Sequence, residues 1–150
     1  MNLTRRESFG LAAGAFVLAS GLGRTSALAD AEATRKVMLE FTGGAEPKTG
    51  TISLTAPEIA ENGNTVPVSF DVDSPMTEAD HVASVIILAV GNPGPEVATF
   101  HFTPMSGEAA ATTRMRLAKT QDVMAIAKMS DGSVFMDTKQ VKVTIGGCGG

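Results

Sequence analysis

The sequence predicts an all-β fold, an immunoglobulin-like antiparallel β-sandwich with a short N-terminal helix and a flexible C-terminal glycine-rich arm. About eight short segments alternate apolar with polar residues, which is the pattern of strands that bury one face. Turn-rich stretches such as "ENGN" at 61–64 and "GNPGP" at 91–95 separate these segments. Since a single segment has helical spacing, a sandwich is favoured over a barrel or an α/β fold.

The amino terminus has the three parts of a twin-arginine-type export signal. Arg5 and Arg6 form a basic start, residues 9–22 form an apolar middle, and Ala27-Leu28-Ala29 forms a small-residue end. The apolar stretch is shorter than the roughly 20 residues that a membrane-spanning helix needs. We therefore expect cleavage after Ala29, with Ala31 as second choice, and a mature protein that resides in the periplasm without a membrane anchor.

The predicted organisation has three parts: a signal peptide at 1–29, a β-sandwich domain at 30–145 and an arm at 146–150. Residues 30–41 predict the helix, because Ala33, Val37 and Phe41 share one face and two glycines follow. The predicted strands are 51–56, 66–73, 82–90, 97–102, 112–118, 123–129, 133–137 and 140–145.

Two of these strands, 82–90 and 123–129, are apolar on both faces. In the first, Ile86 and Leu88 point one way and Val85 and Ile87 the other, so both faces need cover. The N-terminal helix or a protein partner could supply this cover, and the two alternatives are compatible.

Composition excludes several classes of function. The whole chain has a net charge of −4 and the predicted signal a net charge of +2, so the remainder has a net charge of −6 and nucleic acid is a poor partner. His81, His101 and Cys148 are not at metal-ligand spacing, and no haem-attachment motif or nucleotide-binding glycine loop is present. We expect no cofactor and no catalytic residue. His101 lies between two phenylalanines and is expected to face outward.

The carboxyl end places the chain's only cysteine in "GGCGG", where Gly146, Gly147, Gly149 and Gly150 surround Cys148. Val141, Val143 and Ile145 are expected to anchor the last strand in the core. Beyond them, three extended residues carry the thiol roughly 10 Å from the domain. An unperturbed thiol has a pKa of about 8.5, so we expect Cys148 to be a weak nucleophile by itself. Its activation would then come from the protein site into which the arm inserts the thiol. It cannot form a disulfide within the chain, and is free, modified or paired with another molecule.

The sequence resembles the SoxY family, the carrier proteins of the periplasmic Sox sulfur-oxidising system. The resemblance covers nearly the whole chain. It is carried by the twin-arginine leader, "FTGG" at 41–44, "PEIAENGNTVPVSFDVDSPMT" at 57–77, "NPGPEVATFHFTPMSG" at 92–107, "RLAKTQDVMAIAKMSDGS" at 116–133 and the terminal "VKVTIGGCGG".

This resemblance implies a covalent carrier of sulfur intermediates in thiosulfate oxidation. It places the attachment site at Cys148 and implies a heterodimer with a SoxZ-like subunit. That subunit would cover the strands that are apolar on both faces. It also implies that a haem enzyme joins thiosulfate to the thiol, that a hydrolase then releases sulfate to leave a persulfide, and that a sulfane dehydrogenase oxidises the outer sulfur. The residues alone leave a second interpretation open, a non-catalytic binding or structural module that Cys148 cross-links to a partner.

Overall fold

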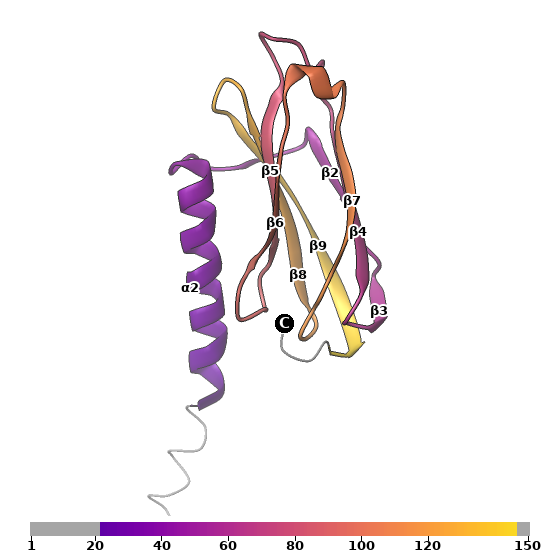
Figure 1. Cartoon of the computed structure of the whole chain (residues 1–150). Helices are drawn as coiled ribbons and strands as arrows, with labels where there is room; N and C mark the ends of the chain where they lie inside the picture. The colour runs from indigo at the N-terminus through magenta and orange to yellow at the C-terminus, as the bar shows by residue number, and fades with distance from the viewer. Residues whose placement is uncertain (1–21, 147–150) are drawn as a thin grey trace, which may run out of the picture.

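The computed structural model describes residues 22–146, which form one helix packed beside a β-sandwich (Figure 1). The helical elements are α2 (Leu22–Thr42) and the short 3-10 helix η1 (Pro104–Ser106). The strands are β1 (Lys48–Thr49), β2 (Ile52–Thr55), β3 (Ile59–Asn62), β4 (Val66–Val72), β5 (Val82–Ala89), β6 (Glu96–His101), β7 (Ala109–Met115), β8 (Gln121–Met129) and β9 (Val134–Ile145).

Within the described residues, the strands form two sheets that face each other. The larger has six strands in the order β1-β9-β8-β5-β6, with β3 also paired to β9, and the smaller has the order β2-β4-β7. All pairs are antiparallel except β1 and β3, which run parallel to β9. The predicted immunoglobulin-like β-sandwich is therefore confirmed, with two short parallel strands added along β9.

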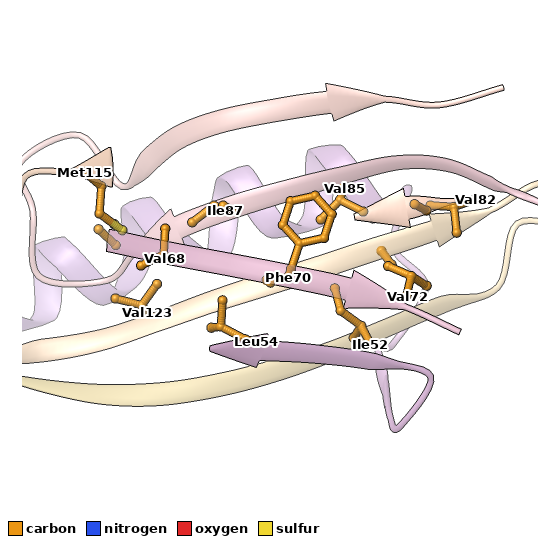
Figure 2. Packing of buried hydrophobic residues seen from close by; sticks show 14 of the residues in the cluster. Ile52, Leu54, Val68, Phe70, Val72, Val82, Val85, Ile87, Met115 and Val123 are labelled. Carbon is orange, nitrogen blue, oxygen red and sulfur yellow. The ribbon is translucent and has the colours of Figure 1, made fainter. Parts of the chain in front are cut away.

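The main core lies between the two sheets (Figure 2). Along β4, every second residue is buried, because side chains alternate between the two faces of a strand. Phe70 of β4 packs edge-on against Phe100, with ring centroids 5.2 Å apart. Burial of such side chains contributes roughly 1.5 to 3 kcal/mol each, so this interior is the main source of the domain's stability.

A second, smaller apolar cluster lies on the outer face of the six-stranded sheet, under α2. Ile86 and Leu88 belong to it, and Val37 and Phe41 of the helix pack against it. This confirms that the N-terminal helix covers one face of the two-faced strands. Cover by a protein partner stays a prediction.

The helix is longer than the predicted 30–41, because it begins at Leu22 and ends at Thr42. Gly43 and Gly44 stop it with φ angles of 66° and 89°, and the Gly44 amide donates to the Leu39 carbonyl oxygen at 3.2 Å. Within residues 22–146, no helix is long and apolar enough to cross a membrane.

The strand predictions were wrong in three places, apart from shifts of one or two residues at the ends of other strands. The strands β1 and β3 were missed, because they are short, mostly exposed and lack a clear alternation. Strand β7 ends at Met115, so residues 116–118 form a loop instead of the predicted strand end. The predicted strands 133–137 and 140–145 form the single strand β9, because the polar residues between them keep pairing with β8.

Candidate functional site

The candidate site is the carboxyl-terminal end of β9, beyond the last residue that pairs with β8. Pairing with β8 ends at the pair Gln121↔Val141. The last four residues of β9 pair with β3 instead, in a parallel register that matches Ile59 to Lys142 and Asn62 to Ile145. The final stretch of β9 therefore projects past its main neighbour.

Hydrogen bonds fix this stretch along both of its edges. On the edge that β8 has left, the Thr120 hydroxyl accepts from the Val143 amide at 2.9 Å. On the other edge, the Thr144 hydroxyl donates to the Glu61 carbonyl oxygen at 2.9 Å, and the Gly63 amide donates to the Ile145 carbonyl oxygen at 2.7 Å. The backbone is thus held up to the residue before Gly146.

The loop 116–120 that carries Thr120 is held by a buried polar side chain from the β5–β6 turn. Asn92 donates from Nδ2 to the Arg116 carbonyl oxygen at 2.8 Å, and its Oδ1 accepts from the Ala118 amide at 3.0 Å. The same Oδ1 accepts from Gln121 Nε2 at 2.8 Å. Since Asn92 is only 6% exposed, these hydrogen bonds are shielded from water.

A further hydrogen bond joins this loop to the turn after β3, where the Leu117 amide donates to the Gly63 carbonyl oxygen at 2.8 Å. Residues 142–146, strand β3 with Gly63 and the loop 116–120 thus form one connected unit, which we call the arm base. Sequence reasoning missed Asn92 and Thr120, because no local pattern connects either residue with the end of β9.

Gly146 fits against the loop of the arm base so closely that a larger residue would not. An added Cβ would overlap the Ala118 carbonyl oxygen and lie 3.2 Å from its carbonyl carbon. The prediction for Gly146 was conformational freedom alone. The structure adds a steric reason for glycine at this position.

The prediction that Ile145 anchors the strand in the core was wrong. Val141 is fully buried and Val143 is partly buried, but Ile145 is 68% exposed. Its position in the alternation is the inward one. Ile145 lies four residues beyond Val141, the last residue of β9 that pairs with β8, and it belongs to neither buried cluster.

The other predicted site residues lie outside the described residues. These are Gly147, Cys148, Gly149 and Gly150. Most of the predicted signal peptide, residues 1–21, is outside as well. Their roles stay predictions.

An ion pair links the helix with the arm base. Lys119 Nζ lies 2.9 Å from Asp30 Oδ2, and a cavity of about 240 Å³ opens beside the pair, with Gln121 and Asp122 in its wall. This volume is below the roughly 300 Å³ at which small-molecule pockets begin. The cavity therefore does not resemble a site for a cofactor of ordinary size.

The two histidines take structural or surface positions. His81 Nδ1 is 3.0 Å from the Thr77 carbonyl oxygen, and His101 is exposed at the end of β6, while the flanking Phe100 and Phe102 pack on the core. The outward direction predicted for His101 is confirmed. Between residues 22 and 146, no group of three or more His, Cys, Asp or Glu side chains is placed to hold a metal ion.

Comparisons with known proteins relate the chain to sulfur oxidation. The family model described as sulfur oxidation protein SoxY matches residues 38–148. The comparison with curated proteins gave no match. Among solved structures, the sulfur carrier protein SoxY from Chlorobium limicola f thiosulfatophilum is similar with a TM-score of 0.66 and 27% identity, over 79% of this chain and 98% of that chain.

Superoxide reductases share the fold at lower identity. The neelaredoxin-type enzyme from Ignicoccus hospitalis has a TM-score of 0.57 and 21% identity, over 62% of this chain and 79% of that one. A putative superoxide reductase from Thermotoga maritima has a TM-score of 0.54 and 19% identity, over 69% and 89%. At these identities the likeness shows the fold alone.

Proposed function

The chain belongs to the SoxY family of sulfur oxidation proteins, and on this premise we propose that it carries sulfur intermediates covalently on the thiol of Cys148. Family membership supports a sulfur-carrier role in the Sox system. The observation that carries the finer proposal is the extent of the family match, which runs to residue 148, the chain's only cysteine, two residues beyond the arm base.

The proposed chemistry uses one sulfur atom of this chain. The Cys148 thiolate and thiosulfate join through a new S–S bond to give a Cys–S–S–SO₃⁻ adduct, and two electrons pass to the haem-containing conjugating enzyme. Hydrolysis by water then breaks the bond to the sulfonate sulfur, which releases sulfate and two protons and leaves a cysteine persulfide. Six electrons from the outer sulfur then pass to a sulfane dehydrogenase, while three water molecules supply the oxygen atoms of Cys–S–SO₃⁻ and release six protons. Hydrolysis of its S–S bond by water releases sulfate and two protons and frees the thiolate.

In this proposal the chain presents the sulfur and the partner enzymes supply the catalytic groups. The side chains that hold the arm base are threonines and an asparagine, which bond the backbone and do not titrate near neutral pH. A SoxZ-like subunit is the proposed heterodimer partner. The periplasm, reached by the twin-arginine route, is the proposed compartment.

Intact mass of the protein isolated from thiosulfate-oxidising cells tests the proposal. We expect reductant-labile additions of sulfur, sulfonate or thiosulfonate on the wild-type chain, and we expect none on Cys148→Ser, which keeps the side-chain size but removes the thiolate. If the wild type carries no addition and shows only disulfide-linked dimers, the chain is a module cross-linked through its cysteine and the carrier proposal fails.

A further inference from the structure

We propose that Gly146 is a fixed point of the domain, so that the arm proposed to carry the thiol begins at Gly147 and not at Gly146. This inference rests on the proposed carrier function and concerns how the thiol is positioned. It separates Gly146, which has a steric role in the arm base, from the rest of the motif.

The first argument is the space around the glycines. Gly146 faces the Ala118 carbonyl group, where an added Cβ would overlap the oxygen. On the far side of the same loop, a Cβ on Gly91 would lie 2.9 Å from Lys119 Cε and 3.1 Å from Gln121 Cβ. Six other glycines, of which Gly94 is one, have no atom within 4 Å of an added Cβ. Both closely packed glycines therefore contact the loop of the arm base.

The second argument is the backbone that precedes Gly146. The Val143 amide donates to the Thr120 hydroxyl at 2.9 Å. The Ile145 carbonyl oxygen accepts from the Gly63 amide at 2.7 Å. The loop that faces Gly146 is itself fixed by the buried Asn92. Because both contacting segments are held by hydrogen bonds, the loop cannot move away from Gly146 without breaking some of them.

A fixed Gly146 shortens the reach of the thiol. Cys148 is the second residue after Gly146. An extended chain advances at most about 3.6 Å per residue, so the Cα of Cys148 stays within roughly 7 Å of the fixed point. A partner enzyme must therefore bring its reacting group close to the arm base itself. We infer that the position of Gly146 determines which active sites the thiol can enter, because misplacement by about 1 Å lowers the rate by up to 10²-fold.

Pulsed electron paramagnetic resonance on the full chain tests this inference. One nitroxide is attached to Cys148 and one to Ser53→Cys, since Ser53 is exposed on β2. Gly146→Ala and Gly147→Ala are the matched pair, because each adds one methyl group to one glycine of the motif. We expect Gly146→Ala to shift the mean distance by about 3 Å, the length of one residue, or to double its spread. Gly147→Ala should leave the mean distance unchanged, and it should not broaden the distribution. Equal distance distributions for the two variants would overturn the proposal.

A second pair of variants keeps the test valid if Gly146→Ala does not fold. Thr120→Val removes the hydroxyl that accepts from the Val143 amide, and Thr120→Ser keeps it. We expect Thr120→Val to broaden the Cys148 distance distribution and Thr120→Ser to restore it. No broadening in Thr120→Val would contradict a fixed arm base.

Sulfur loading of the unlabelled variants separates this inference from the proposed function. If Cys148 carries no sulfur in any variant, the carrier function fails, and the distance measurements still report on Gly146. If the wild type is loaded, we expect Gly146→Ala to be loaded about tenfold more slowly and Gly147→Ala within about twofold of the wild type. Equal loading rates for the two variants would show that the fixed point does not position the thiol.

Discussion

The two parts of strand β9 are held by different forces. In the part up to Val141, each residue from Val134 on pairs with β8, and the two end residues are buried, Val134 at 2% exposure and Val141 at 0%. In the part from Lys142 to Ile145, hydrogen bonds to β3 and Thr120 replace that burial. The first part therefore contributes domain stability, whereas in our proposal the second part sets where the arm begins.

Substitution of Val141 should give the largest loss of stability along β9. Val141→Ala removes two buried methyl groups from the main core, so we expect the free energy of unfolding to fall by about 2 kcal/mol in urea titration. Ile145→Ala is the control in the other part of the strand. Because Ile145 is 68% exposed, its effect should stay within about 0.5 kcal/mol. Similar losses for the two variants would remove the distinction between the two parts.

The same pair of residues shows what the sequence could predict. Alternation along β9 correctly marked Val141 as a core residue, but it marked Ile145 in the same way. Alternation along a strand shows which face each residue occupies. It does not show where along the strand the core ends. The sandwich and the helix over the two-faced strands were predictable, because their patterns are local and repeat over many residues.

The candidate site was predictable only in part. The sequence proposes Cys148 because it is the only cysteine and stands among glycines, and its role stays a prediction. The arm base could not be found, since Asn92 and Ala118 are separated by 26 residues and Thr120 and Val143 by 23. Such contacts follow from the fold and leave no short motif in the sequence.

Substitution of Asn92 should destabilise the arm base, because hydrogen bonds from Asn92 hold the loop 116–120. Asn92→Ala leaves the Ala118 amide and the Arg116 carbonyl oxygen without this partner, and it leaves Gln121 Nε2 with only its hydrogen bond to the Lys119 carbonyl oxygen. Unsatisfied buried groups cost about 1 to 3 kcal/mol each before rearrangement and entry of water, so we expect a net loss of about 2 kcal/mol. Hydrogen exchange should also accelerate at Ala118 and Val143.

The control for Asn92 is Asn64→Ala, which makes the same chemical change at an exposed turn position. We expect its stability to stay within about 0.5 kcal/mol of the wild type and its exchange at Ala118 to be unchanged. If Asn92→Ala accelerated exchange across β8 and β9 alike, the arm base would not be separable from the rest of the strand.

The smallest effect is expected at Asp137, which ties the first part of β9 to the other sheet. Its Oδ2 accepts from the Leu54 amide of β2 at 2.8 Å, and its Oδ1 accepts from the Thr138 amide at 2.8 Å. Burial raises the pKa of Asp137, but these hydrogen bonds and the nearby Lys139 ammonium outweigh burial and hold the pKa below its usual 3.8. The carboxylate is therefore stabilised in the folded state.

A depressed carboxyl pKa contributes stability above the unfolded pKa and loses it as the pH falls through the folded value. Asp137→Asn keeps one oxygen acceptor but loses the charge, so we expect it to be about 1 kcal/mol less stable at pH 7. In urea titrations from pH 7 to pH 2, this difference should shrink below about pH 4. Asp122→Asn is the control, because Asp122 is an exposed residue of β8. A difference between wild type and Asp137→Asn that stays constant down to pH 2 would show that the charge of Asp137 does not join the two sheets.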